Sequence, residues 1–313
     1  MNTENAHPIT GQMSPVVQPQ SAPWHQGLRW GLTSATHLVA FVIAVVMVFP
    51  LLWMFSTSVK PAEEMFVFPP HLLPSQWHFE NYVEAWDAAR FSRYFTNSVA
   101  VSVAGTALTI GVCAMAAYAF SKIDFKGREA LFWLVLSSQM IPGIVTLIPS
   151  FLVIKNMPFA GGNNWLGKGG HGWLNSYAGL ILPGAGTAFG VFLLRQFFLS
   201  VPDDLLDAAR VDGSHEFGIF ARIVMPLAKP AIATLTIFTF QAYWNDFIWP
   251  LVITSEDRYR TVQIGLTVFR QRFTTDWGPL MAGVAIATAP MIVVFLVFQR
   301  YFVSGVALTG LKG

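Results

Sequence analysis

The sequence predicts an all-helical, polytopic membrane protein, because its composition is that of a membrane protein and because six of its segments are apolar over the length of a bilayer. Of the 313 residues, 54% are hydrophobic and 12% are charged, whereas soluble domains carry about 25% charged residues. Mean hydropathy is +0.51. A net charge of +2 argues against a nucleic-acid-binding protein.

The chain divides into a tail, six spans and a short C-terminal end. We expect residues 1–35 to be a disordered tail, since they are rich in Pro, Gln and Ser and lack apolar periodicity. Residues 36–303 form the transmembrane domain, and residues 304–313 form a C-terminal tail. A span needs about 20 apolar residues, and six segments satisfy this length: Leu38–Ser56, Ser98–Phe120, Leu131–Ile154, Ala178–Leu199, Ala231–Ile253 and Met281–Val303.

Proline residues lie inside several predicted spans. They would break helices in water, but they are tolerated in a membrane where neighbouring helices satisfy the freed backbone groups. We therefore keep six spans in spite of internal prolines such as Pro50, Pro142, Pro149, Pro183 and Pro290.

The residues show no signature of catalysis or of metal binding. The chain has no H-E-x-x-H and no G-x-S-x-G motif, and its seven histidines are scattered. Its one cysteine, Cys113, excludes an internal disulfide, and we expect it to pack inside a span.

One short stretch, GGNNWLGKGG at residues 161–170, has the spacing of a phosphate-binding loop. Gly162, Gly167 and Lys168 match G-x-x-x-x-G-K, but Gly169 follows where a serine or threonine would hold magnesium. No strand precedes it. We interpret it as a coincidence in a flexible, glycine-rich loop.

The orientation of the spans is ambiguous on charge alone. Six spans place both termini on one side, and the 19 Lys and Arg residues then divide ten to nine between the two sides. Cation-rich loops tend to be cytoplasmic, so Lys122, Lys126 and Arg128 indicate that their loop lies in the cytoplasm. Arg90 and Arg93, at the other end of the second span, indicate the reverse orientation.

The hydrophilic loop at residues 200–230 predicts a helix, a turn and a second helix. Pro202 and Asp203 are residues preferred in a first helical turn, and Gly213 allows a sharp turn. After the turn, Phe217 and Phe220 begin an apolar stripe at helical spacing. On this pattern alone, a juxtamembrane helix that lies on lipid headgroups is the favoured interpretation.

The order of residues in this loop resembles a known family. D-A-A-R-V-D-G at residues 207–213, followed by F-x-x-I-x-x-P-L-x-x-P, is similar to the EAA loop of permease subunits of binding-protein-dependent ABC importers. WNDFIWPL at residues 244–251 and the ending QRYFVSGVALTGLKG resemble the sugar-importer branch, like the second permease of the maltose importer.

This resemblance implies a type I ABC importer permease fold, in which the EAA loop is cytoplasmic and forms a coupling helix on an ATPase subunit. Asp207, Ala208 and Ala209 take the E-A-A positions, with an aspartate in place of the usual glutamate. Three more residues of the loop join them as coupling residues: Asp212, Gly213 and Phe217. The C-terminal GLKG is also implied to contact the ATPase, and both termini are cytoplasmic in a bacterial or archaeal plasma membrane.

The resemblance further implies a complex. A second, homologous permease completes a heterodimer, two ATPase subunits bind ATP and magnesium, and an extracytoplasmic solute-binding protein delivers the ligand. This chain is then a transport subunit surrounded by lipid, with no cofactor, no catalytic residue and no nucleic-acid partner of its own.

The fifth span carries the candidate substrate path. Asp246 is an acid within a predicted span, which marks a functional site. Gln241 and Asn245 share its face, and Trp244 could stack on a sugar ring. Alternatively, Asn245 and Asp246 pair with a neighbouring helix or hold the backbone opened by Pro250. We expect a sugar or oligosaccharide as substrate. The alternative substrates are an amino acid, a peptide, a polyol or glycerol phosphate. The alternative class of protein is a secondary carrier.

Overall fold

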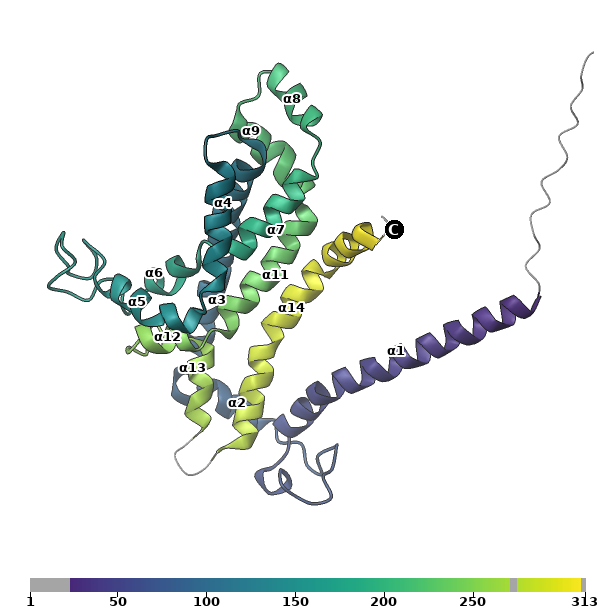
Figure 1. Cartoon of the computed structure of the whole chain (residues 1–313). Helices are drawn as coiled ribbons and strands as arrows, with labels where there is room; N and C mark the ends of the chain where they lie inside the picture. The colour runs from purple at the N-terminus through teal and green to yellow at the C-terminus, as the bar shows by residue number, and fades with distance from the viewer. Residues whose placement is uncertain (1–22, 271–274, 311–313) are drawn as a thin grey trace, which may run out of the picture. The chain divides into compact units, whose positions relative to one another are not determined.

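The computed structural model describes residues 23–270 and 275–310, and over these residues the protein is helical (Figure 1). Within them no strand forms beyond a single isolated bridge between Arg270 and Thr275. The α-helices are α1 Pro23–Ser58, α2 Glu80–Asp87, α3 Phe91–Lys122, α4 Arg128–Ser137, α5 Gly143–Lys155, α6 Tyr177–Ile181, α7 Ala188–Leu199, α8 Asp203–Val211, α9 Glu216–Ile219, α10 Met225–Leu227, α11 Lys229–Asn245, α12 Ile248–Ile253, α13 Val262–Leu266 and α14 Trp277–Gly310.

The chain forms two compact units, residues 1–53 and residues 54–313. In the first unit the described residues belong to α1, which begins at Pro23. Residues 23–35 are therefore helical where we expected a disordered tail, and residues 1–22 lie outside the described residues. An apolar window suited to crossing a membrane starts at Ala35.

Three helices are long and apolar enough to cross a membrane unbroken: Ala35–Ser58 of α1, Phe91–Lys122 of α3 and Trp277–Tyr301 of α14. They agree with the first, second and sixth predicted spans. Pro50 and Pro290 lie inside two of them without ending the helix.

The other three predicted spans are bent rather than straight. Helix pairs meet at 105° between α4 and α5, at 47° between α6 and α7, and at 80° between Glu216–Leu227 and α11. Pro142 stands directly before α5, and Pro183 lies in the last turn before the second bend. Because proline lacks an N–H and crowds the carbonyl four residues earlier, helices break at these positions. By length and composition, the described residues contain up to six candidate spans if each bent pair counts as one.

The second unit is built around α3, which packs against α7 and α11, and α14 packs on the other side of α11 (Figure 1). Small residues bring these helices close together. A β-carbon on Gly190 of α7 would lie 2.8 Å from Sγ of Cys113 on α3. Cys113 is fully buried in the core cluster, so the expected packing role of this cysteine is confirmed.

The glycine-rich loop between α5 and α6 is compact, and its predicted flexibility stays a prediction. A β-carbon on Gly161 would collide with the carbonyl oxygen of Gly172, and one on Gly170 with that of Gly161. Asn163 is buried in the loop, and its Nδ2 donates to the carbonyl oxygens of Lys155, at 2.9 Å, and Met157, at 3.1 Å. The glycines therefore allow backbone segments of the loop to pack directly against one another.

Candidate functional site

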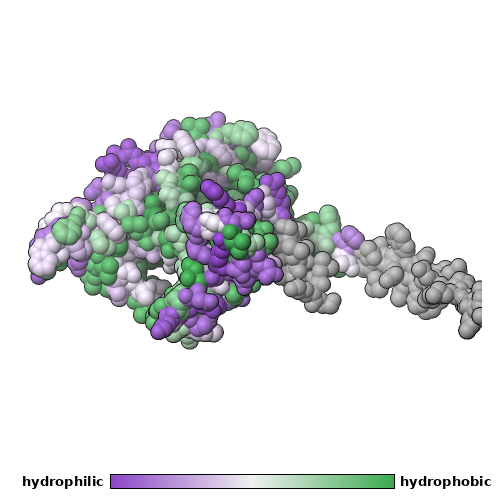
Figure 2. All heavy atoms as spheres, turned by 90° about the horizontal axis from the view of Figure 1, so that it is seen from above, coloured by the Kyte–Doolittle hydropathy of each residue, from purple (hydrophilic) through white to green (hydrophobic). Residues whose placement is uncertain are grey.

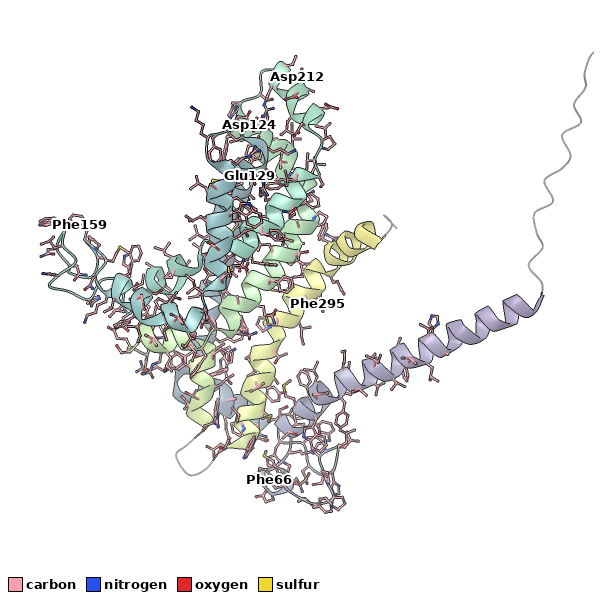
Figure 3. The ribbon with its side chains drawn as sticks, in the orientation of Figure 1. Phe66, Asp124, Glu129, Phe159, Asp212 and Phe295 are labelled. Atoms are coloured by element: carbon pink, nitrogen blue, oxygen red, sulfur yellow. The ribbon has the colours of Figure 1, made fainter. Side chains whose placement is uncertain are left out.

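The predicted helix-turn-helix is confirmed as α8 and α9, at one end of the second unit (Figure 1). Gly213 has φ +82°. Its N–H donates to the carbonyl of Arg210, and that of Ser214 to the carbonyl of Ala209. This pair of bonds is the Schellman ending of a helix, in which glycine takes the left-handed position. Figure 3 shows Asp212 at the tip of the hairpin, at the same end of the unit as Asp124 and Glu129.

Helix α8 has one buried and one exposed face. Leu206 and Ala209 are buried in the core cluster that also contains residues of α3. Leu205, at 48% exposure, and Val211, at 88%, face outward with Ala208 between them. Figure 2 looks down on this end, where hydrophilic and hydrophobic residues alternate over the surface. Exposed aliphatic side chains beside a small alanine suit a protein partner.

The predicted coupling residues therefore lie on different faces. Ala208 is exposed, but Ala209 packs inside the protein, so only one alanine of the pair is open to a partner. Phe217, which we placed in an apolar stripe, is 65% exposed, and its ring lies 5.9 Å from that of Phe220. Asp212 and Gly213 are exposed at the turn.

Ion pairs connect α8 to α9 and to α3. Arg210 donates from Nη1 to Asp207 Oδ1 at 2.7 Å and from Nε to Glu216 Oε1 at 2.8 Å. Glu216 and then Asp207 raise the pKa of Arg210 above its usual value, and the guanidinium stays charged. Beside them, Lys122 contacts Asp203 at 2.6 Å and holds the pKa of that carboxyl below its usual value. Asp207, which the resemblance places at the first EAA position, is thus already paired within its own loop.

A second candidate site lies where α11 ends. The helix stops at Asn245, Asp246 is extended, and α12 begins at Ile248. Pro250 explains the break, since the carbonyl four residues before it is that of Asp246. The predicted continuous span from Ala231 to Ile253 is therefore interrupted, and Asp246 Oδ1 accepts the N–H of Trp249 at 3.3 Å at the start of α12. This contact agrees with the alternative in which Asp246 holds the opened backbone.

Asp246 also lines two pockets. One of 470 Å³ is bounded by α5, the bend between α6 and α7, and the break before α12, and one of 250 Å³ lies beside it. Both share Gly184, Tyr243 and Asp246. The larger is also lined by Thr146, Ser150 and Trp249. Hydroxyl, carboxylate and aromatic groups around one space offer donors, acceptors and a flat surface to a polar ligand.

The structure brings only one of the four predicted path residues into these pockets. Trp244 is 1% exposed, its Nε1 donates to the carbonyl of Ala287 at 2.9 Å, and its ring stacks on Phe240. It packs in the core and lines neither pocket. Gln241 and Asn245 are exposed but line neither pocket.

Two aromatic residues of the same segment were missed. Tyr243 donates its hydroxyl to the carbonyl of Ile181 at 2.8 Å, and Trp249 Nε1 donates to that of Gly179 at 2.9 Å. Both side chains therefore hold α6 against the fifth span and line the larger pocket. The proline at 250 was the available signal, because a helix broken there turns Trp249 to a new face.

The phosphate-loop spacing has no phosphate-loop structure around it. Residues 161–170 follow α5 and form turns, with no strand before them and no helix opening after Lys168. Among the described residues, no three His, Cys, Asp or Glu side chains are placed to hold a metal ion.

Bent helices of membrane-spanning length around a pocket that contains a carboxylate are features of membrane transport proteins. The chain belongs to the family of binding-protein-dependent transport system inner membrane components, whose family model matches residues 107–308. This confirms the resemblance seen in the sequence: the chain is an ABC transporter permease, a multi-pass membrane protein and a transport subunit rather than an enzyme.

Relatives align along most of their length. The probable ABC transporter permease protein YurM of Bacillus subtilis (strain 168) is 34% identical over 308 residues, covering 98% of this chain and 96% of YurM. The arabinooligosaccharides transport system permease protein AraQ of the same organism is 33% identical over 282 residues, covering 89% and 95%. A solved bacterial ABC transporter involved in the import of the acidic polysaccharide alginate has the same fold, with a TM-score of 0.73 at 24% identity, covering 91% of this chain and 100% of that one.

Proposed function

We propose that this permease forms part of the translocation path for a sugar or oligosaccharide, and that α8 is the coupling helix that transmits ATP-driven movement to it. The pocket beside Asp246 supports a polyhydroxyl ligand, because it combines hydroxyls, a carboxylate and the ring of Trp249 in 470 Å³. The names of relatives such as AraQ point to the same class of ligand.

The observation that carries the coupling role is the surface of α8. Leu205, Ala208 and Val211 form an exposed, mostly apolar stripe on a short helix whose other face is buried. Acidic groups flank the stripe at Asp204 and Asp212. A partner cleft with apolar walls and a cationic rim is complementary to this surface.

The proposed complex contains this chain with six spans, a second homologous permease, two ATPase subunits that bind ATP and magnesium, and an extracytoplasmic solute-binding protein. Both termini and α8 lie in the cytoplasm, and the glycine-rich loop lies outside. In this arrangement the ATPase subunits hydrolyse ATP, and the permeases move between inward-facing and outward-facing states.

Cross-linking tests the coupling role directly. With a second cysteine in the ATPase cleft, Val211→Cys forms a cross-link in the assembled complex, because Val211 is the most exposed aliphatic residue of α8. Lys168→Cys is the matched control, because Lys168 is also exposed but lies on the glycine-rich loop. A cross-link from position 168 and none from 211 would refute the assignment of α8.

Uptake by the reconstituted complex tests the substrate class. Neutral oligosaccharides are expected to be taken up in the presence of ATP and the binding protein. Uptake of an amino acid, a peptide, a polyol or glycerol phosphate in their place would replace the sugar assignment. Uptake without the ATPase subunits would indicate a secondary carrier.

A further inference from the structure

The inner end of α3 is bonded to the hairpin at two points. Lys122, whose side chain is only 3% exposed, donates from Nζ to the carbonyl of Val201 at 2.7 Å and to Asp203 Oδ1 at 2.6 Å. One turn earlier, the Tyr118 hydroxyl donates to Glu216 Oε2 at 2.6 Å. These three bonds hold the beginning of α8 and the beginning of α9.

The bond between Tyr118 and Glu216 is connected to α8 through Arg210. Glu216 accepts the Tyr118 hydroxyl on one oxygen and Arg210 Nε on the other, and Arg210 also binds Asp207. A series of hydrogen bonds thus runs from α3 through α9 to the acidic position of the EAA sequence. Hydrogen bonds to charged groups are stronger than neutral ones and have more restricted geometry.

Apolar packing supports this contact. The ring of Tyr118 lies 5.3 Å from that of Phe220. Leu206 and Ala209 on the inner face of α8 are buried in the same cluster as Tyr118. Helix α8 is therefore seated on the end of α3, and is not held only by its covalent connections to α7 and α9.

The other part of α3 reaches the pocket beside Asp246. Gly105 lies so close to Tyr243 that a β-carbon there would be 2.6 Å from the ring, and Thr109 Oγ1 donates to the carbonyl of Gly184 at 3.2 Å. Tyr243 and Gly184 line both pockets. At 1.5 Å per residue, about 20 Å of unbroken helix separates Gly105 from Tyr118.

We propose that Tyr118, Lys122, Asp203, Arg210 and Glu216 form a positioning link, here called the α3 link, which makes α8 and α3 move as one body. Movement of α8 then reaches Tyr243 and Gly184 directly along α3. This inference rests on the proposed role of α8 as the coupling helix. It adds a route from that helix to the pocket and names the residues that make it.

The test is the number of ligand molecules transported per ATP hydrolysed by the full complex in proteoliposomes. Tyr118→Phe keeps the ring against Phe220 but removes the bond to Glu216, and Glu216→Gln weakens the same bond. Each is expected to lower the transport ratio about tenfold, the order expected for one hydrogen bond to a charged group. KM for ATP is expected to stay unchanged. The double variant should be no worse than Glu216→Gln alone, since Tyr118→Phe removes a bond that Glu216→Gln has already weakened.

The control is Tyr82→Phe, which makes the same chemical change where the hydroxyl lies 2.8 Å from Ser58 Oγ, away from the hairpin. It should retain the wild-type ratio. A merely structural role for Tyr118 would lower the yield of assembled complex and leave the ratio at the wild-type value, which would overturn the proposal.

Amide hydrogen exchange in the same complexes gives a second measurement. Exchange of residues 203–211 should be about tenfold faster in Tyr118→Phe and unchanged in Tyr82→Phe. Wild-type exchange in Tyr118→Phe and Glu216→Gln would also overturn the link. If instead the wild-type complex shows no transport and no ATPase stimulation, the proposed function fails, and the exchange measurement still decides whether the link exists.

Discussion

Substitutions at Gly213 test whether the hairpin turn depends on the backbone conformation of this residue or on the volume of its side chain. Its φ is +82°, and a β-carbon there would meet no atom within 4 Å. The cost of a substitution is therefore conformational. An alanine in the left-handed region costs roughly 1 to 2 kcal/mol, whereas asparagine occupies that region more readily. Valine costs more than alanine, because a β-branched residue is an outlier at positive φ.

These energies predict an order of activity. A loss of about 1 to 2 kcal/mol changes the ratio of intact to opened turn by a factor of roughly 5 to 30. ATP hydrolysis stimulated by the loaded binding protein should therefore fall little in Gly213→Asn, several-fold in Gly213→Ala and furthest in Gly213→Val. The assay uses the reconstituted complex, normalised to the amount of assembled permease, since membrane insertion is not expected to change.

Two results would refute this reasoning. If Gly213→Asn is as impaired as Gly213→Val, the position is sensitive to side-chain volume, and a close contact with the ATPase replaces strain as the cause. If all four proteins hydrolyse ATP at one rate, the Schellman turn is not needed for coupling.

Three further predictions concern the pocket, the orientation and pH. Asp246→Ala should raise the KM for uptake about tenfold, because it removes both a pocket carboxylate and the acceptor at the start of α12. Asp246→Asn keeps an acceptor and should raise the KM less. Unchanged uptake kinetics in both variants would leave only a structural role for Asp246. Lys168→Cys in a Cys113→Ser background should react with an impermeant thiol reagent on intact cells, and reaction only after permeabilisation would invert the topology. Because Lys122 lowers the pKa of Asp203, the ion pair stabilises the fold above the usual carboxyl pKa of about 3.9 and is lost as pH falls through the lowered value. The difference in Tm between wild type and Asp203→Asn should accordingly be constant at neutral pH and disappear in acid, and a difference that persists at the lowest pH measured would contradict the pairing.

The sequence predicted the elements that depend on local chemistry. The hairpin follows from Pro202 and Asp203 at its start and Gly213 at its turn, and the structure has both helices there. The apolar segments likewise predicted where spans lie. Their bends were not predicted, because tolerance of proline depends on neighbouring helices, and Pro290 sits inside an unbroken helix while Pro142 stands at a bend of 105°.

The candidate sites were predicted less well, because side-chain direction depends on tertiary packing. Helical spacing placed Trp244 beside Asp246, but the break at Asp246 directs Trp244 into the core and Trp249 to the pocket. In the hairpin, two adjacent alanines look equivalent in sequence, and only Ala208 remains exposed. The bond between Tyr118 and Glu216 joins residues 98 apart, and no local pattern predicts it.

The compact loop between α5 and α6 restricts how the protein can be engineered. Surface loops usually accept insertions and tags, since their backbones have room around them. Here an added methyl group on Gly161, Gly167, Gly170 or Gly172 would collide with a backbone oxygen, so the segment should tolerate changes at its exposed side chains, such as Lys168, but not at its glycines. Epitopes and fluorescent labels on this loop should be attached at such side chains, and insertions within residues 161–172 should be avoided.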